Sequence, residues 1–188
     1  AVATAAHALL TDQADMALAG ASALSFPNQG YLYEDGLVSS IDGKVRPFDA
    51  SASGTVFGDS VGAVVLKRMV DALADSDECL ACLCGLGVTN DGASKAGYAA
   101  PGVPGQREAI CTAMRVGGVE PHHVSMVECH ATGTLVGDGI EARALSDAFE
   151  AGGGGAERGS PCGLTSIKGN IGHANAAAGI TGLAKAVL

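Results

Sequence analysis

The stretch VECHATGT at residues 127–134 is a short apolar run that breaks, at His130, into glycine and small polar residues. A second stretch, SIKGNIGH at residues 166–173, repeats this pattern and ends on His173. Such a pattern is typical of a strand followed by a tight turn, where backbone and imidazole approach a substrate closely because glycine adds no side-chain bulk. The two histidines, with Lys168 five residues before the second, indicate a site that stabilises developing negative charge without a metal.

Helical and strand patterns alternate on either side of these stretches. Residues 26–57 are expected to form a loop-rich connection, and 61–67 a fully buried strand because that run is continuously apolar. Strands spaced by helices of this length favour a parallel sheet with right-handed crossovers. The expected helices are 1–12, 104–117, 138–150 and 174–188, and the other expected strands are 15–20, 79–88, 124–129 and 162–168.

Length and composition bound the class of protein. The chain has 188 residues, 47% of them hydrophobic, which suits one domain or a large part of one. Its formal net charge of -9 argues against a nucleic-acid partner, whose phosphates attract clustered Lys and Arg. The sequence has no apolar run near the roughly 20 residues needed to span a membrane, and no basic segment typical of a signal peptide. A cytoplasmic or organellar location is therefore expected.

Six cysteines raise the question of a disulfide framework or a zinc site. Cys79, Cys82 and Cys84 lie in an apolar run, where a free cysteine behaves as a small hydrophobe. The Cys79-x-x-Cys82 spacing has no second Cys-x-x-Cys or His-x-x-x-His pair to complete four ligands. We therefore expect no metal and a buried strand here. The glycine-rich stretches match no nucleotide-binding motif, so no nucleotide is expected either.

These motifs, in this order, resemble the β-ketoacyl synthase family, in particular the ketosynthase domains of modular type I polyketide synthases. The resemblance runs through essentially the whole chain. The family's His-Gly-Thr-Gly-Thr motif corresponds to residues 130–134, where Ala131 replaces a glycine, and its Lys-x-Asn-Ile-Gly-His motif corresponds to 168–173. The alanine costs little unless its position requires a positive φ. Further matches are RPFD at 46–49, GDGIEA at 137–142 and AAG at 177–179.

The resemblance implies a thiolase-like, layered α/β/α/β/α fold that is incomplete in this chain. Residues 1–70 would end the first half of the domain, 71–78 would connect the halves, and 79–188 would supply most of the second half. The first helix starts without an N-cap residue and the last helix runs to Leu188, so a fragment is expected. None of the six cysteines matches the family's nucleophile, and the isolated polypeptide is expected to be inactive and poorly stable.

The implied reaction is a decarboxylative Claisen condensation between a cysteine-bound acyl chain and a malonyl-type extender. His130 and His173 would donate hydrogen bonds to the enolate oxygen, and Lys168 would keep both imidazoles neutral by like-charge repulsion. Thr132 and Thr134 would contact the phosphopantetheine arm of an acyl carrier protein. The intact domain would be a homodimer and would bind no cofactor directly.

Each residue also has a purely structural interpretation. His130 could be a strand-end histidine bonded to a loop, Lys168 an exposed strand-end cation, and His173 a polar residue at a helix start. Asp138 and Glu141 are expected to cap the helix at 138–150 and compensate its dipole. At the level of function, a non-condensing ketosynthase-like module that transacylates or docks a carrier protein is the main alternative, and a thiolase is a third.

Overall fold

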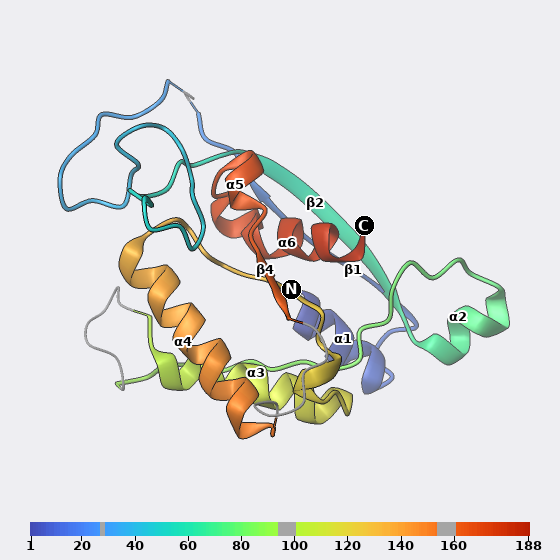
Figure 1. Cartoon of the computed structure of the whole chain (residues 1–188). Coiled ribbons are helices and arrows are strands. Elements are labelled where there is room, and N and C mark those ends of the chain that lie inside the picture. Colours follow the sequence, from blue (N-terminus) through green and yellow to red (C-terminus); the bar gives the residue numbers. More distant parts are fainter. Residues whose placement is uncertain (27–28, 94–100, 154–160) are drawn as a thin grey trace.

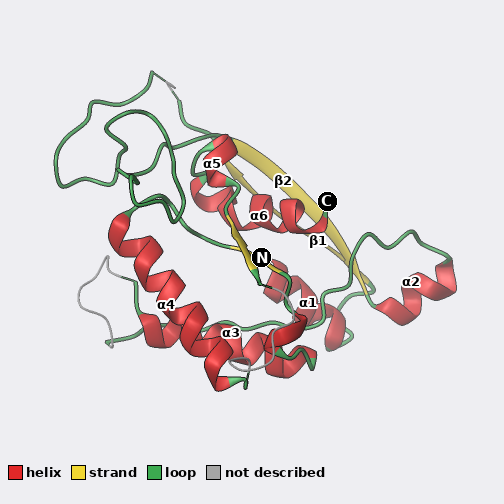
Figure 2. Ribbon diagram, viewed as in Figure 1, coloured by secondary structure: helices red, strands yellow, loops and turns green. Residues whose placement is uncertain are grey.

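The computed structural model describes residues 1–26, 29–93, 101–153 and 161–188 (Figure 1). Two long antiparallel strands, β1 (Met16–Ala23) and β2 (Ser60–Lys67), run side by side through the upper part of the molecule (Figures 1 and 2). Helix α1 (Val2–Leu10) packs at one end of this ribbon. The 3₁₀ turn η2 (Asn175–Ala177) and helix α6 (Ala178–Val187) pack across one of its faces.

The β1–β2 ribbon is buried on one face only, so the expectation of a fully buried strand at 61–67 is wrong. On the inner face, Ala177 and Ile180 pack against small and branched side chains of both strands. Gly62 makes room for this packing, because a Cβ there would lie 3.3 Å from Ile180. On the outer face, Leu18 is 74% exposed and its cross-strand partner Val65 is 62% exposed.

A second, shorter sheet carries the two sequence motifs. Strand β3 (Met126–Glu128) pairs in parallel with β4 (Gly163–Thr165), as the alternation of strands and helices predicts. The expected strand 162–168 is shorter than predicted, because the chain turns at Ser166 and begins the short helix α5 (Lys168–Ile171). Helices α3 (Val103–Gly117) and α4 (Leu135–Ala151) pack against each other, and the 3₁₀ turn η1 (Pro121–His123) lies between them in the chain. Apolar side chains of both helices share a cluster with Val127 of β3 and with Cys129.

The segment 79–88 does not form the expected buried strand. It has no strand partner in the described structure, and it runs extended along α3. The approach is very close at Gly85 and Gly87, where an added Cβ would lie 2.1 Å and 1.9 Å from backbone oxygens of α3. Because the segment pairs with no strand, its three thiols, on Cys79, Cys82 and Cys84, are exposed rather than buried.

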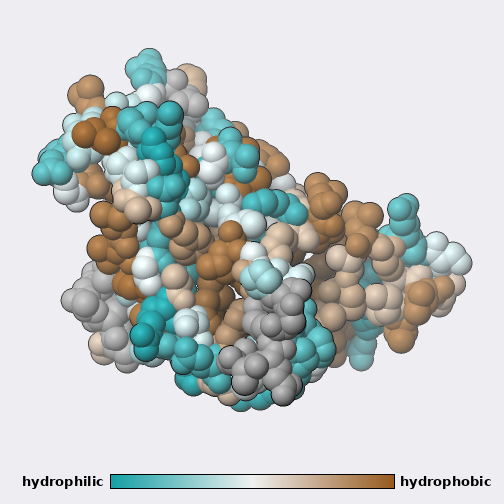
Figure 3. Space-filling model, viewed as in Figure 1, coloured by the Kyte–Doolittle hydropathy of each residue, from teal (hydrophilic) through white to brown (hydrophobic). Residues whose placement is uncertain are grey.

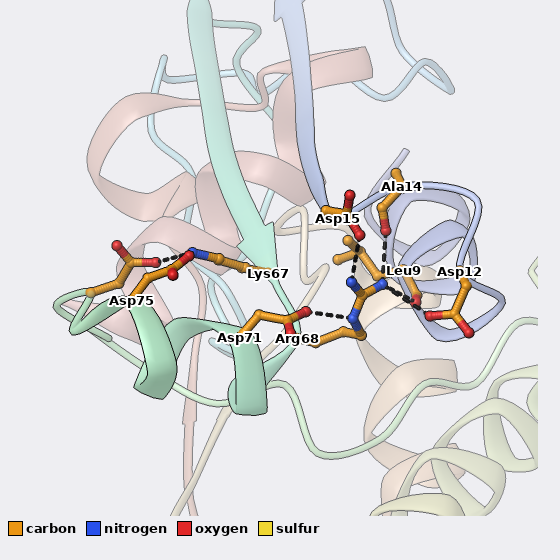
Figure 4. A network of polar contacts seen from close by, with 9 residues as sticks. Leu9, Asp12, Ala14, Asp15, Lys67, Arg68, Asp71 and Asp75 are labelled. Atoms are coloured by element: carbon orange, nitrogen blue, oxygen red, sulfur yellow. Dashed lines mark hydrogen bonds and ion pairs between the residues drawn. The ribbon is translucent and has the colours of Figure 1, made fainter.

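Part of the expected connection at 71–78 is helical. Helix α2 (Met69–Asp75) extends from the end of β2 as an arm with several exposed apolar residues (Figure 3). At the base of this arm, the Arg68 guanidinium donates hydrogen bonds to the carbonyls of Leu9 and Ala14, at 3.0 and 2.9 Å (Figure 4). It also pairs with the carboxylates of Asp12, Asp15 and Asp71. Arg68 therefore ties the end of β2 to the α1–β1 turn.

The expected loop-rich stretch between β1 and β2 is confirmed. Within it, Ser39 and Thr55 form a single β-type pair, and Phe57 forms another with His173. The loop therefore lies against the segment that follows α5, beside the second histidine motif.

Candidate active site

His130 lies in the turn between β3 and α4, and Glu141 holds this turn. The two carboxylate oxygens of Glu141 accept hydrogen bonds from the backbone N–H groups of His130 and Ala131, both at 2.7 Å. Helix α4 begins at Leu135 rather than at 138, so Glu141 lies in its second turn. The expected capping role is wrong for this residue, because its side chain reaches across to the preceding turn.

Asp138 also bonds outside its own helix. Its Oδ2 atom accepts a hydrogen bond of 2.8 Å from the backbone N–H of Phe48. Phe48 has a φ of 59°, a left-handed conformation that is strained for a bulky side chain. Asp138 is therefore a cross-link that holds a strained loop residue, and its side chain makes no cap hydrogen bond to α4. It does lie in the first turn of α4, where its charge suits the helix dipole as expected.

Ala131 fits the position at which related motifs carry glycine. It is 1% exposed and is not among the described residues with positive φ. Its carbonyl accepts a hydrogen bond of 3.0 Å from the hydroxyl of Ser166. The glycine requirement falls on Gly133 instead, which has a φ of 75° and whose Cβ would lie 2.9 Å from the carbonyl of Gly54. The turn therefore accepts the alanine without backbone strain.

Hydrogen bonds fix both backbone groups of His173, and two further contacts fix its imidazole. Its N–H donates to the carbonyl of Val56 at 2.7 Å, and its carbonyl accepts from the N–H of Gly58 at 3.1 Å. The imidazole stacks on Phe57, with ring centroids 5.8 Å apart. Its Nδ1 atom accepts a hydrogen bond of 3.2 Å from the backbone N–H of Asn175. A neutral imidazole with an accepting Nδ1 carries its proton on Nε2.

The two imidazoles meet although they come from separate loops. Their ring centroids are 5.2 Å apart, and the ring planes are nearly perpendicular at 86°. The structure therefore brings together the two histidines that the sequence motifs singled out.

Lys168 is the first residue of α5 and is only 3% exposed, so its interpretation as an exposed strand-end cation is wrong. Burial lowers the pKa of its ammonium group, although nearby carboxylates, Glu141 first, oppose this. Burial, and then the charge of Lys168, lower the pKa of His130, with Asp138 opposing. Burial, His130 and Lys168 lower the pKa of His173 to about 4. The pKa values of both rings are therefore lowered, which favours their neutral forms near pH 7.

Thr132 and Thr134 lie next to each other at the start of α4. Their hydroxyl oxygens are 3.1 Å apart, within hydrogen-bond distance. Thr132 lines a cavity of about 110 Å³ together with His130, Asp138 and Glu141. A second cavity, of about 410 Å³, lies between the loop at 43–46 and α5 and is lined by Lys168. One cavity therefore lies between Thr132 and His130, and a second lies beside Lys168.

The remaining candidate groups lie outside this site or are unreactive. Burial raises the pKa of the Cys129 thiol to about 12, so this cysteine next to His130 is a poor nucleophile. His7, on α1, and His122 and His123, on η1, are exposed. In the parts of the chain that the structure describes, no cluster of three or more His, Cys, Asp or Glu side chains is arranged to hold a metal ion. None of the described helices has the length and apolarity to cross a membrane.

Sequence reasoning missed several residues that shape the site. Glu128, in β3, lies within the first motif and was assigned no role, yet its carboxylate accepts hydrogen bonds from Thr165, Ile167 and Lys185. A single acid in an apolar strand is a usable signal, because a buried charge requires partners. Asn175 and Ser166 gave no such signal, since their roles depend on the backbone path around the histidines.

Comparisons with known proteins agree with this geometry. The profile of the "Beta-ketoacyl synthase, N-terminal domain" matches residues 1–72, and that of the "Beta-ketoacyl synthase, C-terminal domain" matches residues 80–188. A phenolphthiocerol/phthiocerol polyketide synthase protein of Mycobacterium tuberculosis is 47% identical over 181 residues, which are 96% of this chain and 12% of that protein. The polyketide synthase PksN of Bacillus subtilis is 40% identical over 96% of this chain and 3% of that protein.

Solved structures show the same likeness. Ketosynthase twelve of the bacillaene polyketide synthase of Bacillus amyloliquefaciens superposes with a TM-score of 0.93 at 36% identity, covering 99% of this chain and 33% of that one. The ketosynthase from module 1 of the bacillaene synthase of the same species gives a TM-score of 0.90 at 39% identity, covering 99% of this chain and 32% of that one. The chain thus spans about a third of these ketosynthases.

The fold is that of the thiolase-like ketosynthases, a mixed α/β fold, as the sequence predicts. The chain belongs to the β-ketoacyl synthase family, and its relatives are ketosynthases of polyketide synthases.

Proposed function

We propose that these residues supply the decarboxylating part of a ketosynthase active site in polyketide biosynthesis. The observation that carries the proposal is the edge-to-face pair of His130 and His173, with Nε2 of His173 left as the proton-bearing nitrogen. Two neutral N–H donors that converge on one oxygen suit an enolate, whose charge forms only as the reaction proceeds.

In the proposed reaction, the bond between the malonyl carbon and its carboxylate breaks, and carbon dioxide leaves. The electron pair stays on the thioester as an enolate, and its oxygen accepts hydrogen bonds from His130 and His173. The enolate carbon then attacks an acyl group held as a cysteine thioester, and the cysteine leaves as a thiolate. We assign this nucleophile to none of the six cysteines of the chain.

Lys168 acts on this reaction through charge. Because it is buried near both rings, its ammonium group disfavours a second positive charge on either imidazole. A protonated imidazole is also incompatible with the hydrogen bond from Asn175, since Nδ1 then becomes a donor. Thus the electrostatics and the hydrogen bonds of the site both favour neutral rings.

We further assign Thr132 and Thr134 to the phosphopantetheine arm of an acyl carrier protein, which would deliver the extender. Thr132 lines the cavity that His130 also lines, and the Thr134 hydroxyl lies 3.1 Å from that of Thr132, so an arm held there would end near the first imidazole. The proposal includes a homodimer, no directly bound cofactor, and a division of the chain into 1–70, 71–78 and 79–188 as parts of two halves. The cytoplasmic or organellar location stays a prediction.

The test uses an intact ketosynthase domain that includes these 188 residues, supplied with malonyl and acyl carrier proteins. Mass spectrometry of the carrier proteins follows decarboxylation, acylation of the domain and the condensed product separately. Loss of decarboxylation in His130→Ala and His173→Ala, with product formed by the parent domain, supports the proposal. Acylation without decarboxylation in the parent domain would instead favour a non-condensing, transacylating module.

A further inference from the structure

Glu128 is a buried carboxylate that the proposed chemistry does not use. Its side chain is 7% exposed, although it lies in a strand only two residues before His130. Burying an unpaired carboxylate costs several kcal/mol or more, so the fold can accommodate Glu128 only if hydrogen-bond partners compensate this cost.

Three donors from two other parts of the chain compensate this burial. Oε1 accepts a hydrogen bond of 2.6 Å from the backbone N–H of Ile167. Oε2 accepts one of 2.7 Å from the Thr165 hydroxyl and one of 2.8 Å from the Lys185 ammonium group. Burial raises the pKa of Glu128, but the bonds from Lys185, Thr165 and Ile167 outweigh it, and the pKa is lowered overall. The group is therefore a carboxylate at neutral pH.

These partners belong to the segments that carry the site. Ile167 immediately precedes Lys168, and Lys185 lies in α6, the helix that follows His173 and η2. Glu128 itself leads through Cys129 to His130. Helix α6 also packs directly on this side chain, because a Cβ at Gly182 would lie 3.3 Å from Cγ of Glu128. One carboxylate thus joins the strand that leads to His130, the turn that leads to Lys168, and the helix that follows His173 and η2.

We infer that Glu128 is a positioning residue for the reaction, which sets the relative placement of His130, Lys168 and His173 through its bonds to Ile167, Thr165 and Lys185. This inference depends on the proposed function, because the quantity that it controls is the convergence of the histidines on one oxygen. Glu128 lies behind the turn and does not line the cavity at His130, so it acts through other residues.

The test compares two half-reactions of the same intact ketosynthase domain. Decarboxylation of a malonyl thioester needs the converged histidines, whereas acylation of the nucleophile by an acyl thioester proceeds without enolate stabilisation. In Glu128→Gln, we expect kcat for decarboxylation to fall by up to about 100-fold, the loss typical of a misplacement near 1 Å. KM and the rate of acylation should stay near the parent values. Lys185→Met should show the same split with a smaller loss, and Lys185→Arg should restore most of it.

Matched controls separate positioning from general loss of charge. Asp147→Asn and Arg143→Met remove an ion pair of 2.7 Å on the outside of α4, in which Arg143 is 71% exposed, and should leave both half-reactions unchanged. Gly182→Ala presses on Glu128 and should lower decarboxylation, whereas Gly179→Ala in the same helix meets no atom within 4 Å and should not.

A purely structural Glu128 would change both half-reactions in proportion to the folded fraction, or neither, and either result overturns the inference. If Glu128→Gln does not fold, Thr165→Val is used instead, because it removes only one hydrogen bond to the carboxylate. It too should lower decarboxylation while leaving acylation unchanged. A parent domain that cannot decarboxylate would defeat the proposed function and this inference together. An active parent whose variants show no split defeats the inference alone.

Discussion

The backbone N–H of Asn175 donates a hydrogen bond to Nδ1 of His173 at 3.2 Å, which only a neutral ring with its proton on Nε2 accepts. The pKa of this ring is lowered to about 4, first by burial and then by His130 and Lys168. One arrangement therefore specifies both the charge and the tautomer of the imidazole. Asn175 can present its N–H there because it adopts a φ of 42°, a left-handed conformation that asparagine tolerates better than most residues.

Removing either imidazole should abolish most of the decarboxylation. In His130→Ala and His173→Ala, we expect kcat to fall by about 10²–10³-fold, the usual cost of one donor to a developing oxyanion. The double variant should lose less than the product of the two single effects, because both donors serve one oxygen. Carbon dioxide release from a malonyl thioester measures this. The exposed His122 and His123 provide the control. If His122→Ala and His123→Ala slow decarboxylation as much as His130→Ala and His173→Ala do, then His130 and His173 are not the donors to the enolate.

The charge on Lys168 should help to lower the acidic limit of activity. In the parent domain, the neutral form of His173 should persist as pH falls below 6.5 towards 4. In Lys168→Met the repelling charge is lost, so the pKa of both rings should rise and the acidic limb of the pH–rate profile should move to higher pH. Histidine NMR titration gives the same quantities without turnover. If the acidic limb of the Lys168→Met profile stays in place or moves to lower pH, then Lys168 does not lower the pKa of the two rings.

The same shift has a consequence for stability. Because the folded pKa of His173 lies below its unfolded value of 6.5, the unfolded chain takes up the proton first as pH falls. The contribution of this ring to stability is therefore full above pH 6.5, declines between 6.5 and 4, and changes no further below 4.

Most of the helices, the parallel pairing of β3 with β4 and the two histidine turns could be predicted from sequence, because they depend on local patterns. Apolar runs ending in glycine located the turns at His130 and His173, and the family resemblance supplied their roles. The burial of single strands was not predictable in this way. The apolar runs at 61–67 and 79–88 look alike in sequence, yet the first is covered on one face only and the second pairs with no strand in the described structure.

The supporting residues were harder to foresee for a different reason. Asp138 and Glu141 were expected to cap α4, since acids near a helix start usually do so. Helix α4 begins three residues earlier than expected, and both side chains instead bond backbone groups of other segments. Their roles depend on how two loops are placed in space, and no local pattern contains that information.

Two glycines beside His173 should be irreplaceable, whereas a third should not. A Cβ at Gly58 would lie 2.1 Å from the carbonyl of Ile171, and Gly172 has a φ of 78° with the Val56 carbonyl oxygen only 2.8 Å from its Cβ position. Gly58→Ala and Gly172→Ala should therefore displace His173 and lower decarboxylation more than acylation. Gly139 lies in α4 with nothing within 4 Å, and Gly139→Ala should stabilise the domain by about 0.5–1 kcal/mol. Kinetics and thermal unfolding of the three variants test this ordering.

The Arg68 network should contribute more to stability than the neighbouring Lys67 pairs. In the described structure, the recorded ion pairs of Lys67 are those with Asp75 and Asp77, whose carboxylates are exposed, and pairs with exposed carboxylates are worth little in water. Arg68 also donates to the carbonyls of Leu9 and Ala14, so its loss leaves two backbone acceptors without their partner. In urea unfolding of the intact domain, Arg68→Met should lower the midpoint more than Lys67→Met.

High salt provides the control for this comparison. It screens the carboxylate pairs but not the carbonyl bonds, so it should shrink the effect of Lys67→Met more than that of Arg68→Met. Equal shifts that both vanish in salt would show that the carbonyl bonds add nothing.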